Sequence, residues 1–272
     1  MTRVVPRTTV KADVTITGRG LHSGAPCRVT IRPSGHGIHF IAGGEAIEAT
    51  VENVSDTSRC TRLGAVSTVE HCLSALWGLG VTDAAVEVEG GELPGLDGSA
   101  APYVEALLAN GFYGVGELHI DGPFARVYHI DGPVKIAIAA GEGHWRYTYD
   151  LGERWPSEQS YEVALSPSSY AQEIASARTI VLEEEIDLAR AAGLGQGLEE
   201  GGVVAIGKQG YLTEVRFPNE PARHKLLDLI GDLALSGVPC AALNVTADRS
   251  GHRTNVAAAA KLARHVRIRR VP

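Results

Sequence analysis

The chain has few cysteines, and none of them are paired at short spacing. Cys27, Cys60, Cys72 and Cys240 are scattered over 272 residues, and no C-x-x-C motif is present. This distribution argues against a disulfide framework or a thiolate zinc site, and it predicts free thiols in a reducing compartment. We therefore expect a cytoplasmic protein.

Long apolar runs and an excess of positive charge are also absent. No stretch approaches the roughly 18 apolar residues of a membrane-spanning helix, and the N-terminal MTRVVPRTTVKAD lacks the apolar core of a signal peptide. Lysine and arginine total 25 against 32 acidic residues, a formal charge of −7. This balance is not the electrostatic footprint of a nucleic-acid-binding protein. We expect neither a transmembrane segment nor a nucleic-acid partner.

What the chain does have is enough apolar material, 44% of its residues, for one large domain or two smaller ones. In the first part, alternating residues over 7–41 predict an antiparallel sheet. A helix over 67–79, a strand over 84–90 and a short helix over 101–111 follow. Mixed elements of this kind indicate the α+β class.

The second part repeats this plan. Strands are predicted over 124–130, 134–140 and 145–151, and a helix over about 182–192 follows. A second, longer helix over 220–237 precedes a strand over 241–247.

Two motifs occur in both parts in the same order. The pattern H-x-L-x-x-L-x-G is found at 71–78 and 224–231, and V-x-x-A-A-[VL]-x-V at 81–88 and 238–245. Chance matching of apolar residues is the alternative, but two ordered matches favour duplication. We predict two similar α+β domains, residues 1–118 and 119–272, that meet near 115–125.

The helix over 220–237 carries polar residues on an otherwise apolar surface. His224, Asp228 and Asp232 recur at i, i+4 and i+8, so they share one helix face. His71 is the counterpart of His224 in the repeat. If the two helices face one another, two imidazoles and the Asp228 carboxylate form a ligand set for catalytic zinc with one position left for water. Each histidine alone is more often a hydrogen-bonded core residue. Cys72 points to another face and is predicted to be buried.

Three further residues suit proton transfer. Glu70 either caps its helix together with Ser67 or acts as a general base. Asp232 is either an exposed carboxylate or the partner of His252, which lies in a Gly/Ser-rich stretch predicted to be a loop. A histidinium held there could protonate a leaving group. Together these residues indicate metal-assisted hydrolysis of an amide or an ester.

Several stretches of the chain resemble the UDP-3-O-acyl-N-acetylglucosamine deacetylase family, zinc amidases of lipid A biosynthesis. The matching segments are TGRGLHSG (17–24), STVEHCLSALWGLGV (67–81), LPGLDGSAAPYVEAL (93–107), SARTI (176–180), RFPNEPARHKLLDLIGDLALSG (216–237) and SGHRTN (250–255). The resemblance implies two α+β domains whose helices lie between two sheets. It also implies a monomer acting on an acylated UDP-amino sugar.

The resemblance implies a role for each candidate residue. The implied zinc ligands are His71, His224 and Asp228, although iron(II) could occupy the same site. The implied base is Glu70, and the implied acid is His252 held by Asp232. The hydroxyl of Thr179 is implied to bind the carbonyl oxygen, and Lys225 and Ile180 are implied to contact substrate.

The match weakens where the family forms a passage for the acyl chain. An aromatic residue usually follows the A-R-T triplet, and Ile180 stands there in this chain. The segment 193–206, with Glu199 and Glu200, also departs from the pattern. A related zinc deacetylase with a different N-acetylated amino sugar, or a catalytically silent zinc-binding homologue, are the alternatives.

Overall fold

The two parts of the chain form sheets with identical topology. The structure, a computed structural model, describes residues 2–122 and 126–272. The strands of the first sheet, in spatial order, are β2 (Val14–Arg19), β3 (Pro26–Arg32), β8 (Ala84–Glu89), β4 (Ile38–Ala42) and β5 (Glu45–Glu48). Those of the second are β10 (Val127–Asp131), β11 (Val134–Ala140), β16 (Leu243–Asp248), β12 (His144–Asp150) and β13 (Glu158–Ala164). In both sheets the third and fourth strands are parallel and the other neighbours antiparallel. This shared order agrees with the predicted duplication.

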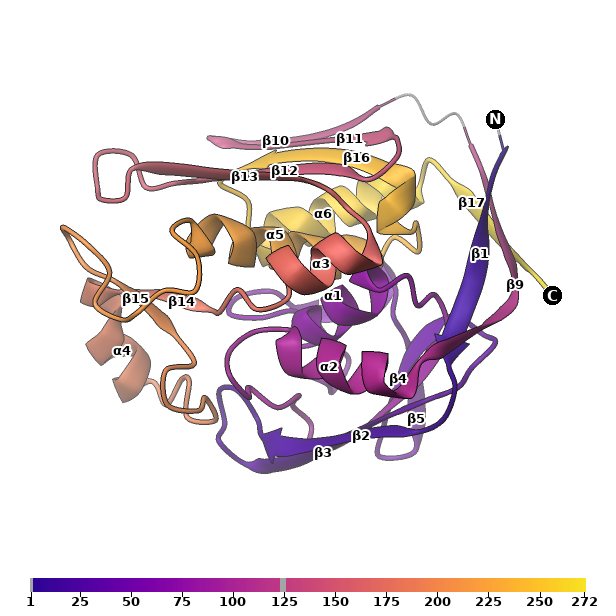
Figure 1. Cartoon of the computed structure of the whole chain (residues 1–272), viewed down its shortest axis with the longest axis horizontal. Helices are drawn as coiled ribbons and strands as arrows, with labels where there is room; N and C mark the ends of the chain where they lie inside the picture. Colours follow the sequence, from indigo (N-terminus) through magenta and orange to yellow (C-terminus); the bar gives the residue numbers. More distant parts are fainter. Residues whose placement is uncertain (1, 123–125) are drawn as a thin grey trace.

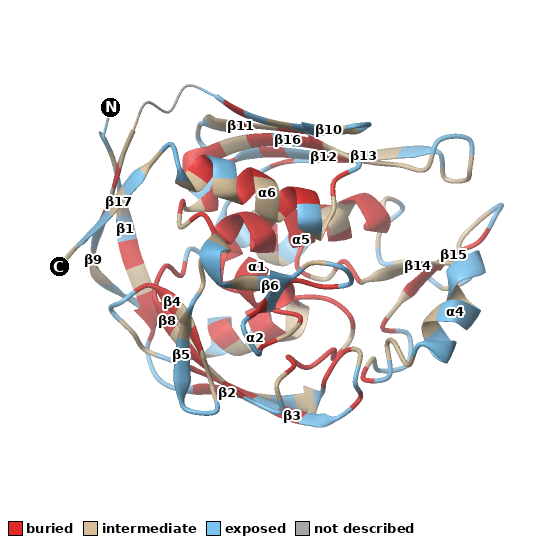
Figure 2. Ribbon diagram, turned by 180° about the vertical axis from the view of Figure 1, so that it is seen from behind, coloured by how far each residue is buried: buried red, intermediate tan, exposed pale blue. Residues whose placement is uncertain are grey.

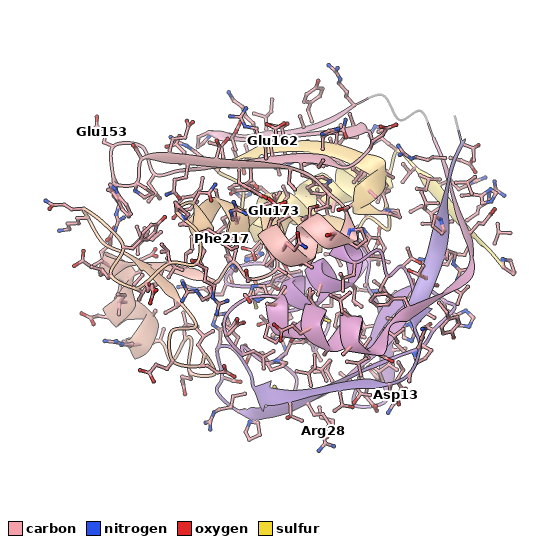
Figure 3. The ribbon with its side chains drawn as sticks, viewed as in Figure 1. Asp13, Arg28, Glu153, Glu162, Glu173 and Phe217 are labelled. Atoms are coloured by element: carbon pink, nitrogen blue, oxygen red, sulfur yellow. The ribbon has the colours of Figure 1, made fainter. Side chains whose placement is uncertain are left out.

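The four longest helices lie between these two sheets (Figure 1). The repeated pairs are α1 (Glu70–Gly78) with α5 (Glu220–Ala234), and α2 (Ala101–Asn110) with α6 (His252–Ala263). Every residue of α1 is buried, as is every residue of α5 except Arg223 and Lys225 (Figure 2). Arg28 on β3 and Glu162 on β13 are exposed and lie on opposite sides of the molecule (Figure 3). The α+β fold with helices between two sheets is therefore confirmed.

Gly231 explains how closely α1 and α5 approach. A Cβ atom built on Gly231 would lie 2.1 Å from the backbone oxygen of Glu70. Only glycine fits where two backbones come this near. The repeated motif thus ends in a glycine that brings the start of α1 against the middle of α5.

A third sheet joins the two ends of the chain. It contains β1 (Thr2–Val10), β9 (Phe112–Asp121) and β17 (Arg267–Val271), with β9 in the centre. The boundary predicted between residues 118 and 119 lies within β9. β17 carries the three arginines Arg267, Arg269 and Arg270, and Arg269 pairs with Asp121.

The remaining elements are short. The passage segment, which we define as residues 180–206, contains β14 (Ile180–Leu182), the 3-10 turn η2 (Glu183–Glu185), α4 (Ile186–Ala191) and β15 (Val204–Ile206), and β14 and β15 pair in parallel. The others are η1 (Val51–Asn53), β6 (Val54–Asp56), β7 (Arg62–Leu63), α3 (Pro167–Glu173) and η3 (Cys240–Ala242). None of the helices in the described ranges combines the length and apolarity that crossing a membrane requires.

Two predicted helix starts are wrong. The helix predicted over 67–79 begins at Glu70, because Thr68 has φ of 62°, which lies outside helical conformation. The predicted capping by Ser67 is therefore not formed. The helix predicted over about 182–192 begins as a 3-10 turn at Glu183 and is α-helical only from Ile186, because Leu182 pairs in β14.

Other differences are local. His252 is the first residue of α6 rather than a loop residue. Helix α3 was not predicted, although Ser166 caps it and Pro167 stands at its start. The strand predicted over 241–247 begins at Leu243, after a 3-10 turn. Of the strand predicted over 124–130, residues 124 and 125 lie outside the described residues.

Candidate metal centre and active site

Two helices from different halves of the chain bring three potential metal ligands together. His71 stands at the start of α1, and His224 and Asp228 lie one turn apart on α5. Asp228 Oδ1 lies 3.6 Å from His71 Nε2 and 3.5 Å from His224 Nε2. The two imidazole rings have centroids 5.2 Å apart and are nearly perpendicular. All three side chains are buried.

The three ligand atoms fit a single metal ion. Two ligands about 2.05 Å from a tetrahedral zinc lie about 3.3 Å apart, close to the two observed separations. Asp228 Oδ1 is buried and accepts no hydrogen bond from the described residues. An unpaired buried carboxylate oxygen costs free energy, and a cation bound there would remove this cost.

The tautomer of His224 also suits metal binding. Its Nδ1 lies 3.0 Å from the backbone oxygen of Ala177. Because a carbonyl oxygen can only accept, Nδ1 carries the proton and donates a hydrogen bond to this carbonyl. The lone pair of Nε2 then points to Asp228 and the metal position. Hydrogen bonds of this kind orient the histidine ligands of metal sites.

Burial and charge set the protonation of this cluster. Burial lowers the pKa of His224 to about 4, against the attraction of Asp228. Burial by itself would raise the pKa of Asp228, but His224 and Lys225 hold it well below its ordinary value. At neutral pH the His224 imidazole is therefore neutral and the Asp228 carboxylate is ionised, the forms that bind metal.

Glu70 faces this centre from the start of α1. Its Oε2 accepts a hydrogen bond from the backbone N–H of Thr61 at 2.9 Å, and its Oε1 lies 3.9 Å from His252 Nε2. Burial raises the pKa of Glu70. A carboxylate with a raised pKa and one oxygen free is suited to accept a proton from a nucleophile.

His252 contacts Asp232, which is the second of the two alternatives considered for Asp232. His252 Nδ1 lies 3.0 Å from Asp232 Oδ2, and Asn255 Nδ2 donates to the same oxygen at 3.0 Å. Burial opposes the charged form of His252, but Asp232 outweighs it and raises the pKa to about 9. His252 is therefore protonated at neutral pH, and its Nε2 faces Asp228 Oδ2 at 4.0 Å.

The residues predicted to contact substrate are Lys225, Thr179 and Ile180, and only Lys225 bonds directly to a proposed metal ligand. Lys225 Nζ donates to Asp228 Oδ2 at 2.9 Å. The backbone N–H of Thr179 donates to Gly98 at 2.8 Å, and its carbonyl accepts from Val204 at 2.8 Å. Ile180 is half-buried at the start of β14. The structure thus gathers seven candidates at the centre. Thr179 directly precedes β14 and Ile180 is its first residue, two and three positions after Ala177, whose carbonyl binds His224.

The sequence analysis missed three residues of the site. Thr61, Asn255 and the carbonyl of Ala177 hold Glu70, Asp232 and His224 respectively. Ala177 and Asn255 lie within the segments SARTI and SGHRTN but had been given no role. Thr61 belongs to none of the quoted segments, and no spacing in the sequence signals it. The four thiols are free and buried, and Cys72 is part of the core.

A buried His-His-Asp cluster flanked by a carboxylate of raised pKa and a cationic histidine is typical of a mononuclear metallohydrolase. Comparison with known proteins agrees. Residues 7–264 match the model of the UDP-3-O-acyl N-acetylglycosamine deacetylase (LpxC) family. The chain belongs to this family of deacetylases.

Relatives from several bacteria bear the name UDP-3-O-acyl-N-acetylglucosamine deacetylase. The chain is 39% identical over 269 residues to that of Anaeromyxobacter sp. (strain Fw109-5), covering 93% of this chain and 87% of the relative. It is 34% identical over 261 residues to that of Syntrophus aciditrophicus (strain SB), covering 91% and 82%. With that of Nostoc sp. (strain PCC 7120) it is 36% identical over 252 residues, covering 84% and 88%.

Proposed function

We propose that the chain hydrolyses the N-acetyl group of UDP-3-O-acyl-N-acetylglucosamine in lipid A biosynthesis. The products are acetate and the UDP-3-O-acyl-glucosamine with a free amine. The observation that carries this proposal is the convergence of His71, His224 and Asp228 on one position, with Glu70 and His252 on its flanks. Membership in the deacetylase family supports the choice of substrate.

The proposed ligands are His71, His224 and Asp228, and the proposed ion is zinc. Two imidazoles and one carboxylate are a common ligand set for catalytic zinc, and iron(II) fits the same donors. When bound, the ion would polarise the amide carbonyl and lower the pKa of water to about 7.

Glu70 and His252 are the proposed proton carriers. Glu70 takes a proton from the attacking water through its free Oε1. His252 gives the proton on Nε2 to the departing amine as the C–N bond breaks, and Asp232 stabilises the cation until then. The pKa of both groups is raised: a higher pKa makes the Glu70 carboxylate a stronger proton acceptor, and it keeps His252 protonated, the form that an acid requires.

The remaining candidates are proposed to bind substrate. The hydroxyl of Thr179 would donate to the carbonyl oxygen, where negative charge develops during attack. The ammonium of Lys225 would reach anionic parts of the UDP-sugar once a metal ion neutralises Asp228. Ile180 would contact the acyl chain at the entrance of the passage segment.

A second candidate function is deacetylation of another N-acetylated amino sugar. It is favoured by Ile180 and by the departures of the passage segment from the family pattern, in which Glu199 and Glu200 are exposed. A silent zinc-binding homologue is the third reading. The hydrogen bonds that hold Glu70 and His252 in place argue against it, because metal binding alone requires neither residue.

The test is acetate release by the zinc-loaded protein. UDP-3-O-acyl-N-acetylglucosamine of several acyl lengths is compared with UDP-N-acetylglucosamine, and Glu70→Ala is measured alongside. Preference for an acylated substrate, lost in Glu70→Ala while zinc stays bound, is the expected result. Turnover of the acyl-free sugar alone would favour the second candidate. No turnover despite stoichiometric zinc would contradict both enzymatic candidates.

We also propose that the chain acts as a monomer in the cytoplasm. Every residue of the proposed site comes from one chain, so the site requires no second copy. Four buried free thiols suit a reducing compartment. Sedimentation analysis of the purified protein and fractionation of cells test these two statements.

A further inference from the structure

Arg178 and Glu220 form a buried ion pair beside the metal centre. Arg178 is 6% exposed and Glu220 is fully buried. Arg178 Nε donates to Glu220 Oε1 at 2.9 Å, and Nη2 donates to Oε2 at 3.1 Å. Arg178 stands between Ala177, whose carbonyl holds His224, and Thr179. None of the mechanistic roles proposed above involves this pair.

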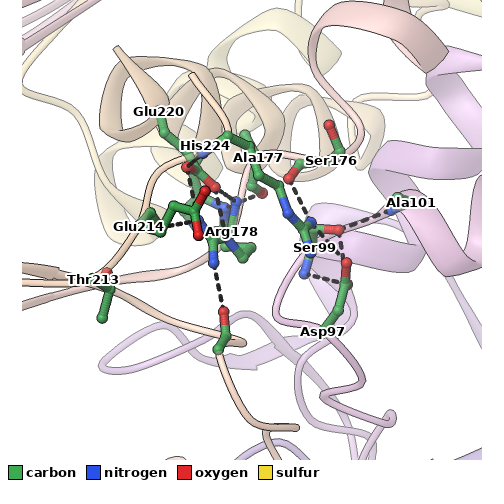
Figure 4. A network of polar contacts seen from close by, with 12 residues as sticks. Asp97, Ser99, Ala101, Ser176, Ala177, Arg178, Thr213, Glu214, Glu220 and His224 are labelled. Carbon is green, nitrogen blue, oxygen red and sulfur yellow. Dashed lines mark hydrogen bonds and ion pairs between the residues drawn. The ribbon is translucent and has the colours of Figure 1, made fainter. Parts of the chain in front are cut away.

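The pair connects several segments that are distant in sequence. Arg178 Nη1 donates to the carbonyl of Gly201 in the passage segment at 2.6 Å, and Nη2 donates to the carbonyl of Glu214 at 2.7 Å (Figure 4). Glu220 Oε2 also accepts from the backbone N–H of Arg216 at 2.7 Å. One guanidinium and one carboxylate thus fix the passage segment and the loop before α5 to the first turn of that helix.

The backbone of residues 177–178 lies along one turn of α5. The N–H of Arg178 donates to Glu220 Oε1 at 3.0 Å, and the carbonyl of Ala177 accepts from His224 Nδ1 at 3.0 Å. Glu220 and His224 are i and i+4 on the helix, so they lie on the same face. The contact that orients His224 therefore depends on the contact that holds Arg178.

We propose that Arg178 and Glu220 are positioning residues for the reaction. The pair holds residues 177–179 against α5, which orients His224 through Ala177 and fixes the backbone position of Thr179. It also ties the passage segment to the metal helix at Gly201. The inference rests on the proposed function for its activity readout, whereas its metal readout is independent.

Arginine is required at this position for a geometric reason. The planar guanidinium engages both carboxylate oxygens and two carbonyls at once, which a lysine ammonium cannot do. Lysine would keep the charge but lose the fixed geometry. Arg178→Lys therefore tests the contribution of the hydrogen-bond geometry while the positive charge is kept. Glu220→Gln removes the negative charge of the carboxylate with little change in side-chain shape.

A second buried pair provides a matched control. Arg7 is 3% exposed, and its Nε and Nη2 donate to both oxygens of the fully buried Asp83 at 3.2 and 2.6 Å. Its other bonds reach Gly35 and Val271, away from the candidate site residues. Arg7→Lys and Asp83→Asn thus break a similar pair without displacing the segment 177–179.

The experiment measures zinc affinity by competition with a chelator, and kcat and KM for acetate release, in all four variants. Glu220→Gln and Arg178→Lys are expected to weaken zinc binding or lower kcat by about 10- to 100-fold, the range for groups that orient metal ligands. Their KM should stay within about threefold of wild type, because both variants keep the side chains proposed to bind substrate. Arg7→Lys and Asp83→Asn should keep zinc affinity and kcat near wild type.

Either of two results would overturn the proposal. One is wild-type zinc affinity and kcat in both Glu220→Gln and Arg178→Lys. The other is losses no larger than those of the control pair, which would indicate general destabilisation. If the wild-type protein releases no acetate, the proposed function fails, and zinc affinity alone decides the positioning role.

Discussion

The hydroxyl of Thr61 donates a hydrogen bond to Asp232 Oδ1 at 2.5 Å, although 171 positions separate the two residues. The backbone N–H of Thr61 donates to Glu70 Oε2. One residue thus contacts both the proposed base and the carboxylate that holds the proposed acid. The distance between the two proton carriers therefore depends on Thr61.

Thr61→Val should remove the hydrogen bond from the Thr61 hydroxyl to Asp232 and keep the one from the Thr61 backbone N–H to Glu70. The N–H to Glu70 remains, while Asp232 loses one of its hydrogen bonds and holds His252 less firmly. We expect kcat to fall about 10- to 100-fold with little change in KM, as for other groups that orient catalytic side chains. Steady-state kinetics of acetate release measures both quantities.

Two variants serve as controls for Thr61→Val. Thr61→Ser keeps the hydroxyl and should retain most activity. Thr82→Val removes a buried hydroxyl that donates to Asp83 at 2.7 Å, away from the site, and should affect stability alone. Equal kcat values for Thr61→Val and Thr82→Val would show that Thr61 has no positioning role.

Zinc should stabilise the protein against unfolding. A ligand that binds only the folded state adds about 2.7 kcal/mol when its free concentration is 100 times Kd. His71→Ala, His224→Ala and Asp228→Ala should each lose most of this gain, because each removes one of three ligands. The unfolding midpoint with and without zinc, and the zinc content after dialysis, measure the effect.

Cys72→Ala tests whether the Cys72 thiol binds the metal ion. The thiol neighbours His71 in sequence but lies in the apolar core, so this variant should retain stoichiometric zinc and the same zinc-dependent gain. Loss of zinc in Cys72→Ala, or retention in His224→Ala, would contradict the proposed ligand set.

The free energy of unfolding should decrease at acid pH as the Asp83 carboxylate becomes protonated. Burial by itself raises its pKa, but hydrogen bonds from Arg7, Thr82 and Gly37 outweigh burial and lower the pKa below the ordinary value. A depressed pKa stabilises the fold above the unfolded-state pKa of about 3.9, and this stabilisation is lost as pH falls through the folded-state value.

Asp83→Asn should remove this part of the acid dependence. At pH 7 it should cost about 3 to 5 kcal/mol, because Arg7 is left buried with a neutral partner. Asp131→Asn breaks the exposed pair with Arg253 and should cost at most about 1 kcal/mol. Denaturant unfolding between pH 7 and 3 gives these free energies, and equal costs in both variants would contradict the assignment.

Ile180→Ala should weaken the binding of acylated substrate. Burying an isoleucine side chain contributes about 1.5 to 3 kcal/mol, so KM should rise at least about tenfold for the acylated sugar and stay constant for UDP-N-acetylglucosamine. Val181→Ala is the matched control, since its side chain points to the opposite face of β14. The same change in KM for both variants would remove Ile180 from the proposed acyl contact.

Much of the fold, and the grouping of the proposed ligands, was predictable because it depends on local geometry or on a repeated pattern. His224, Asp228 and Asp232 share a face through the helical repeat alone, and the repeated motifs paired His71 with His224. The two sheets share one strand order, which agrees with the predicted duplication. The start of α1 was not predictable from local pattern, because the left-handed backbone of Thr68 and the bond from Thr61 to Glu70 are set by packing.

The sequence by itself determined which residue types were available and which of them share a helix face, because spacing of 3.6 residues per turn is a local property. Only the tertiary structure decided that α1 meets α5 at Gly231, that Thr61 donates hydrogen bonds to both Glu70 and Asp232, and that Arg178 forms an ion pair with Glu220. These contacts join residues far apart in the chain, so they form only where the packed helices and sheets bring the side chains within hydrogen-bonding distance.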